Sequence, residues 1–136
     1  MCFKLKHMFN FSSSSLTLIN SYLTNRAQAV VVNDKTSRLL PVNRGVSQGS
    51  ILGPLLFCLY INDLPKVINT CRTHLYADDV QLYSYCKPSE INNHVAKIND
   101  DLTQILSWTS QNGLSVNPSK SKCICMYRYI ATTDFI

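Results

Sequence analysis

Two adjacent carboxylates give the sequence its clearest candidate for chemistry. Asp78 and Asp79 lie between two apolar segments, HLY at residues 74–76 and VQLY at residues 80–83. Carboxylates this close repel each other unless a cation neutralises them. Mg²⁺ binds one or two protein carboxylates and completes its shell with water and substrate phosphates. Asp is also common in turns, where it hydrogen-bonds locally, and the pair alone favours such an ordinary turn.

A glycine-rich segment is the second candidate for function. Residues 44–54 read RGVSQGSILGP and contain three of the four glycines in the chain. Glycine allows backbone conformations that other residues avoid, and it allows a ligand to approach the backbone closely. The segment therefore predicts a functional loop.

The patterns before residue 84 predict the elements that hold these two segments. One of the serines at positions 12–15 is expected to cap a helix over about residues 14–25. Alternating valines, then Asn33 and Asp34, then Leu40 and Val42 indicate a hairpin. Residues 55–60 predict a short, largely buried helix that Pro65 ends. Asp78 and Asp79 then lie at the tip of a second hairpin.

The rest of the chain predicts one long helix and one strand. Ser89 is expected to cap a helix whose apolar residues recur every three or four positions and face a sheet: Ile91, Val95, Ile98, Leu102 and Ile105. Asn112 and Gly113 end it, and a turn and a strand over residues 123–127 follow. The expected fold is α+β, an antiparallel sheet with hairpins covered by helices on one face.

Composition narrows the class of protein. With 136 residues and 46% apolar content, the chain suits one domain or a piece of one. The net charge of +5 is compatible with a nucleic-acid partner. The six cysteines lack the spacing of a zinc site, and this favours reduced, mostly buried thiols. No signal-peptide pattern or apolar run of about 20 residues occurs, so we expect an intracellular, cytoplasmic or nuclear protein.

Several motifs resemble reverse transcriptases. HLYADDVQLY, around Asp78, resembles the YxDD motif (motif C), and RGVSQGSILGPLLFCLYINDLP at residues 44–65 resembles motif B. SYLTNRAQAV at residues 21–30 and GLSVNPSKSK at residues 113–122 are similar to jockey-like non-LTR retrotransposon segments, the latter at motif D. Intron maturases and telomerase-like proteins share the paired aspartates, but ILGPLLF and INDLP resemble the retrotransposon enzymes more closely. The resemblance implies a partial polymerase palm over residues 1–128, with a tail at 129–136.

The resemblance implies roles for residues in motif C. In that family, motif C and a motif A aspartate hold two ions of Mg²⁺ or Mn²⁺ that act on the primer hydroxyl and the departing pyrophosphate. Asp78 corresponds to the direct metal ligand and Asp79 to its supporting partner. Tyr76 and Ala77 would lie near the primer end.

The resemblance also implies roles outside motif C. Gly45, Gln48 and Gly49 correspond to the motif B loop beside the templating base pair, and Ser50 is expected to cap the next helix. Lys120 or Lys122 corresponds to the motif D lysine proposed to protonate pyrophosphate, with Lys120 preferred. A solvated surface charge is the alternative for either lysine.

One part of the metal centre is expected to be missing. KLKHMFNFS at residues 4–12 resembles the sequence just after motif A, and Asp34, Asp63, Asp100 and Asp101 do not match the motif A aspartate. Fingers and thumb segments are not recognised either. We therefore expect negligible polymerase activity from this chain alone, marginal stability and self-association.

The intact enzyme would bind an RNA template, a DNA primer and deoxynucleoside triphosphates, and its remaining palm, fingers and thumb would contact this chain. One alternative is a noncatalytic palm remnant that binds RNA or primer duplex. A purely structural α+β domain with an incidental acidic turn is another.

Overall fold

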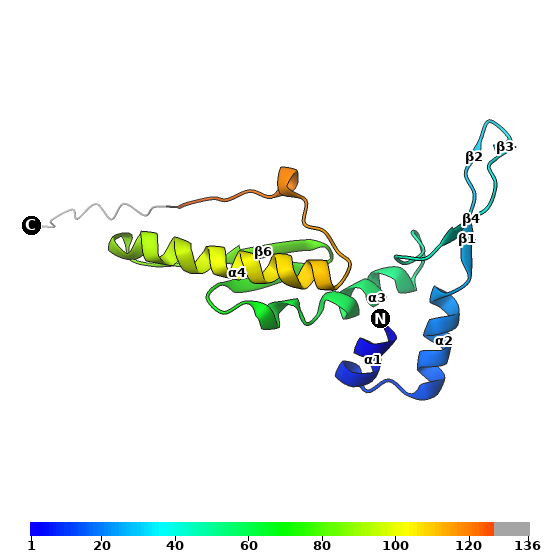
Figure 1. Cartoon of the computed structure of the whole chain (residues 1–136), viewed down its shortest axis with the longest axis horizontal. Helices are drawn as coiled ribbons and strands as arrows, with labels where there is room; N and C mark the ends of the chain where they lie inside the picture. The colour runs from blue at the N-terminus through cyan, green and yellow to red at the C-terminus, as the bar shows by residue number, and fades with distance from the viewer. Residues whose placement is uncertain (127–136) are drawn as a thin grey trace, which may run out of the picture.

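The computed structural model describes residues 1–126, which form an elongated molecule (Figure 1). The helices are α1 (Cys2–Phe9), α2 (Ser13–Leu23), α3 (Leu52–Ile61) and α4 (Ile91–Gln111), with short 3₁₀ helices η1 (Leu64–Val67), η2 (Pro88–Glu90) and η3 (Pro118–Lys120). The strands are β1 (Arg26–Gln28), β2 (Val31–Val32), β3 (Lys35–Thr36), β4 (Leu40–Val42), β5 (Arg72–Tyr76) and β6 (Asp79–Tyr83).

The strands make three separate antiparallel pairs. β1 pairs with β4, β2 with β3, and β5 with β6. The mixed α+β class is confirmed, but the expectation of one shared sheet is not met within residues 1–126. The β1–β4 pair and the β2–β3 pair instead follow one another along a single arm, which projects from one end of the molecule (Figure 1).

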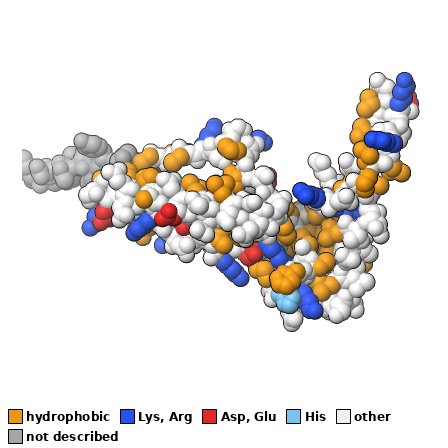
Figure 2. Space-filling view, viewed as in Figure 1, with side chains coloured by type: hydrophobic (Ala, Val, Ile, Leu, Met, Phe, Trp, Pro, Cys, Tyr) orange, Lys and Arg blue, Asp and Glu red, His pale blue; other side chains and the backbone are white. Residues whose placement is uncertain are grey.

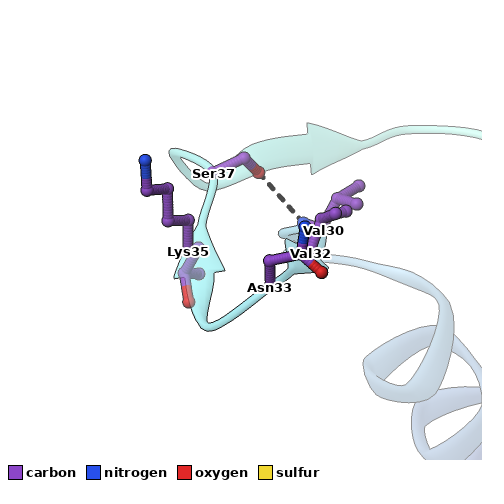
Figure 3. Close-up of a pocket in the computed structure, with 6 residues that line it drawn as sticks. Val30, Val32, Asn33, Lys35 and Ser37 are labelled. Carbon is purple, nitrogen blue, oxygen red and sulfur yellow. Dashed lines mark hydrogen bonds between the residues drawn. The ribbon is translucent and has the colours of Figure 1, made fainter.

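The arm ends in the hairpin turn that the sequence predicted. Asn33 and Asp34 both have positive φ, 47° and 61°, as a two-residue type I′ turn requires. Near this turn, the backbone N–H of Val30 donates to Ser37 Oγ at 2.9 Å (Figure 3). Val30, Val31 and Val32 are exposed, so this end of the arm has no core of its own.

The helix preceding the arm is capped as expected, whereas α3 is less buried than expected. Ser12 Oγ accepts from the Ser15 N–H and caps α2. In α3, Leu56 is buried, but Leu52 and Leu55 are 42% and 55% exposed. Apolar side chains gather where α3 meets α2 and along the arm (Figure 2). The prediction of a largely buried helix is therefore wrong for this face of α3.

The main core lies between α4, η1 and the β5–β6 hairpin. Ile61, Leu64, Ile105 and Trp108 are buried together, and several half-buried residues pack against them: Phe57, Tyr60, Val67, Ile68, Leu75, Leu82 and Leu114. α4 runs along the β5–β6 hairpin (Figure 1). This core fixes the hairpin that carries the paired aspartates.

Two predictions for α4, its N-cap and its buried stripe, are corrected. The helix begins after the 3₁₀ turn η2, so Glu90 and not Ser89 occupies the N-cap. Its stripe is shifted as well, because Val95 and Leu102 are 47% and 42% exposed. The helix does end at Asn112 and Gly113, as predicted.

The strand predicted over residues 123–127 is not found in its described part. Residues 121–126 lie in no strand and are exposed, including Cys123 and Cys125. Local alternation cannot make a strand without a partner for its backbone groups. Tyr127 and the tail at 129–136 lie outside the described residues.

None of the helices described for residues 1–126 is long and apolar enough to cross a membrane.

Candidate functional site

The β5–β6 hairpin presents the two aspartates at its turn. Tyr76 pairs with Asp79, so Ala77 and Asp78 form a two-residue turn between them. Ala77 has a φ of 50°, a left-handed conformation that costs a residue with a Cβ about 1–2 kcal/mol. Such strain is found where the surrounding structure holds it, often at functional sites.

The hairpin has one face toward the core and one face open. Leu75 and Leu82 pack on the core, whereas the residues that alternate with them are exposed, among them Arg72, His74 and Tyr76. Tyr76 is 77% exposed. The open face therefore combines basic and aromatic side chains next to the aspartates.

The carboxylates themselves are exposed. Within residues 1–126, no hydrogen bond or ion pair holds the side chain of Asp78 or Asp79, and no group of three or more His, Cys, Asp or Glu residues could hold a metal ion. Two carboxylates do not make a closed site. They do fit Mg²⁺, which keeps several waters and uses substrate phosphates as further ligands.

The glycine-rich loop leads into α3. Gly45 and Gly49 have φ values of 74° and 77°, and a Cβ at either position would meet nothing within 4 Å. Their conformation, and not crowding, therefore requires glycine. Gly53 is different, because a Cβ there would lie 2.8 Å from Ser50 Oγ.

Ser50 is the centre of a small hydrogen-bond network. Its Oγ donates to the Ser47 carbonyl at 2.6 Å and accepts from the Gly53 N–H at 3.1 Å. The N-cap of α3 is Ile51 and not the predicted Ser50, although the Ser50 side chain does accept from an N–H in the first turn of the helix. Gln48 lies exposed beside this network.

Two residues that sequence reasoning missed hold the loop from α2 and β1. The Tyr22 hydroxyl donates to Ser50 Oγ at 2.6 Å, and Arg26 Nη2 donates to the Gly45 carbonyl at 2.6 Å. Both lie in the SYLTNRAQAV segment, whose resemblance to the region before motif B was the available signal. The loop is therefore fixed at both ends.

Comparison with known proteins places the chain in a family. Residues 1–133 match the family described as reverse transcriptase (RNA-dependent DNA polymerase). The chain belongs to the reverse transcriptase family. No solved structure matches it.

Curated relatives come from mobile elements of Drosophila melanogaster. The chain is 33% identical over 114 residues to the probable RNA-directed DNA polymerase from transposon X-element, covering 79% of this chain and 12% of that protein. It is 34% identical over 113 residues to the probable RNA-directed DNA polymerase from transposon BS, and the match covers 76% of this chain and 12% of that protein. It is 25% identical over 127 residues to the RNA-directed DNA polymerase from mobile element jockey, covering 88% and 13%. The chain thus spans about an eighth of these relatives.

The lysines expected at motif D of this reverse transcriptase chain are exposed. Lys120 ends η3 and Lys122 follows it, beyond the turn that Asn117 stabilises by accepting from the Ser119 N–H. In the described part of the chain, neither lysine makes an ion pair. Their role in protonating pyrophosphate stays a prediction.

Two hollows on the surface of residues 1–126 lie away from the aspartates. One, of about 480 Å³, is on the arm and is lined by Val30, Val32 and Lys35 among others (Figure 3). The other, of about 370 Å³, lies between α2 and α3 and is lined by apolar residues such as Leu18 and Leu55. Neither is lined by residues of the β5–β6 turn, and both aspartates of that turn are exposed.

One buried carboxylate was missed by sequence reasoning. Asp101 of α4 is 1% exposed and accepts from the N–H groups of Asn69, Thr70 and Cys71 at 2.7–2.9 Å. Burial alone would raise the pKa of this carboxyl, but the N–H bonds outweigh it and lower the pKa below its usual value. Burial, together with Asp101, raises the pKa of the Cys71 thiol. A raised pKa makes the Cys71 thiol less readily deprotonated, and therefore less nucleophilic, than an ordinary cysteine.

Proposed function

We propose that this chain is part of the palm of a reverse transcriptase and that Asp78 and Asp79 belong to its metal centre. The observation that carries the proposal is the pair of exposed carboxylates at a strained two-residue turn, in a chain whose residues 1–133 match the reverse transcriptase family. Divalent ions at this turn would stabilise the charge that develops when a primer hydroxyl attacks a nucleoside triphosphate. Asp78 is assigned as the direct ligand and Asp79 as its partner.

The remaining site residues are assigned around this turn. Tyr76 and Ala77 would contact the primer end, because they adjoin Asp78 in the turn. The loop that Tyr22 and Arg26 hold in place would lie along the templating base pair. Its residues assigned to this role are Gly45, Gln48, Gly49 and Ser50. Lys120 would supply the proton to pyrophosphate.

A metal titration tests the assignment without requiring catalysis. In ¹⁵N spectra of the full chain, Mn²⁺ should broaden the amides around residues 77–80 first, and Asp78→Asn with Asp79→Asn should abolish that broadening. The Asn33–Asp34 turn is a matched control, because it is also a two-residue hairpin turn but carries one carboxylate. Equal broadening at both turns would refute the assignment.

Catalysis by the chain alone is expected to be negligible, because positioning of both substrates supplies most of the rate of phosphoryl transfer. A primer-extension assay with Mg²⁺ measures this. DNA synthesis that Asp78→Ala abolishes would contradict the expectation of inactivity while supporting the assigned site.

The open face of the β5–β6 hairpin favours a second candidate function, noncatalytic binding of RNA or primer duplex. Arg72, His74 and Tyr83 are exposed on it, and the chain carries a net charge of +5. Salt-dependent RNA binding without nucleotide incorporation would support this candidate. Binding that does not weaken between low and moderate salt would exclude it.

A further inference from the structure

Asp101 is the most completely buried charged residue in the described part of the chain. Its Oδ1 accepts from the Asn69 N–H at 2.8 Å, and its Oδ2 accepts from the N–H groups of Thr70 at 2.9 Å and Cys71 at 2.7 Å. One carboxylate on α4 therefore fixes three consecutive backbone groups. These three residues immediately precede β5.

The three hydrogen bonds from residues 69–71 to Asp101, called the Asp101 clamp below, are placed where they can set how β5 faces the core. Successive side chains of a strand point to opposite faces, so a slip by one residue would turn every side chain over. In β5, Thr73 and Leu75 face inward, and Arg72, His74 and Tyr76 face outward. A backbone fixed at Cys71 sets this alternation from the first residue of the strand.

Apolar contacts alone specify the alternation weakly. The inner face of the hairpin packs only Leu75 and Leu82 on the core, and Val80 is 40% exposed. An isolated two-stranded hairpin is at best marginally stable in water. The hydrogen bonds to Asp101 are therefore well placed to decide which face of β5 is turned outward.

We propose that Asp101 is a positioning residue for the Tyr76–Asp79 turn. By holding the backbone at residues 69–71 against α4, it fixes the register and orientation of the hairpin, so that Asp78 and Asp79 are presented on the open side. The functional meaning of this positioning rests on the proposed metal centre, whereas the orientation of the hairpin on α4 can be measured without metal.

Residual dipolar couplings of the ¹⁵N-labelled 136-residue chain test the proposal. In the unsubstituted chain, amides of β5, β6 and α4 should fit one alignment tensor. In Asp101→Asn they should require two, because the amide group supplies one acceptor oxygen and leaves N–H groups without partners. Asp100→Asn is the matched control, since Asp100 is the neighbour of Asp101 in the sequence, and its side chain is exposed and forms no hydrogen bond within residues 1–126.

The couplings separate positioning from mere stabilisation. If Asp101→Asn lowers the melting temperature while the hairpin and α4 still fit one tensor, Asp101 only stabilises and the proposal is wrong. If the Asp101→Asn chain does not fold, hydrogen exchange in the unsubstituted chain tests whether the Asp101 clamp and the hairpin open together. The amides of Asn69, Thr70 and Cys71 should exchange together with the bonded amides of β5 and β6. If the amides of Asn69, Thr70 and Cys71 exchange roughly tenfold faster, or more, than the bonded amides of β5 and β6, the proposal is wrong, because the clamp then opens independently of the hairpin.

These measurements use neither metal nor nucleotide. Failure of Mn²⁺ to bind at Asp78 would refute the proposed function and leave the positioning result standing. A hairpin that keeps its orientation in Asp101→Asn would refute the positioning role and leave the metal centre untouched.

Discussion

Replacing Lys4 with methionine tests how α1 is attached to the rest of the chain. The Lys4 ammonium lies 2.6 Å from Asp63 Oδ1 and donates to the Tyr60 carbonyl at 2.9 Å. It also lies 4.7 Å from the centre of the Tyr60 ring and 4.5 Å from that of Trp108. A single cation thus connects α1 with α3, with the segment at Asp63 and with α4.

The burial of this contact sets its magnitude. Only 13% of the Lys4 side chain and 22% of the Asp63 side chain are exposed, so the pair is not an ordinary surface ion pair worth about 0–1 kcal/mol. Removing one partner of a fully buried pair costs about 3–5 kcal/mol. Cation–π contacts contribute about 1–2 kcal/mol when partly desolvated. Because methionine keeps the apolar stem and Asp63 keeps some water, we expect a loss of about 3 kcal/mol.

Urea denaturation followed by the fluorescence of Trp108, the only tryptophan, measures this loss. Lys6→Met is the matched control, because Lys6 lies on the same helix and is exposed. It should change the free energy of unfolding by less than about 0.5 kcal/mol. A double-mutant cycle with Asp63→Asn should give a coupling energy of about 1 kcal/mol or more. Equal effects of the two lysine substitutions would refute the reasoning.

Two further predictions concern the hairpin and its clamp. The pKa of Asp101 is lower in the folded than in the unfolded state, so its stabilising contribution is complete above the unfolded pKa of about 3.9 and is lost as pH falls through the folded value. The difference in unfolding free energy between the unsubstituted chain and Asp101→Asn should therefore stay constant above about pH 5 and shrink below about pH 4. A difference that does not change with pH would contradict the charge assigned to Asp101. Ala77→Gly should raise the free energy of unfolding by up to about 1 kcal/mol, because glycine adopts the observed φ of 50° without strain. Urea denaturation measures this change. A loss of stability would show that the contacts of the Ala77 methyl group stabilise the fold by more than the strain destabilises it.

Local patterns in the sequence were sufficient for the two hairpin turns but not for every strand pair. The turn at Ala77–Asp78 follows from apolar residues on both sides of it. The turn at Asn33–Asp34 was predicted too, but its second strand is Lys35–Thr36. The predicted second strand, Leu40–Val42, pairs with Arg26–Gln28 instead. The class of the fold followed from the two turns and from the helical periodicity of α4. The pairing of strands into one sheet did not, because two-stranded pairs and a continuous sheet have the same local pattern.

The shifted face of α4 shows what the sequence reasoning overlooked. Counting apolar residues alone selected Val95 and Leu102, which are half exposed. The residues buried on α4 are Asp101, Ile105, Trp108 and Thr109, so that Ile105 lies four residues after Asp101 and three and four residues before the other two. Asp101 does not fit an apolar pattern because it is charged. A carboxylate in register with a buried apolar stripe was the available signal, since such a group must find partners.

The hydrogen bonds that anchor the hairpin lie at the end opposite the aspartates. Asp101 holds the base and Leu75 and Leu82 pack on the core, while Asp78 and Asp79 remain exposed and free of side-chain bonds within residues 1–126. Carboxylates already paired with Lys or Arg would have to give up those partners before binding a cation. Anchoring at the base avoids that cost, because it fixes where the turn lies without using the oxygens at its tip. This arrangement suits a metal centre that gains its remaining ligands from a substrate.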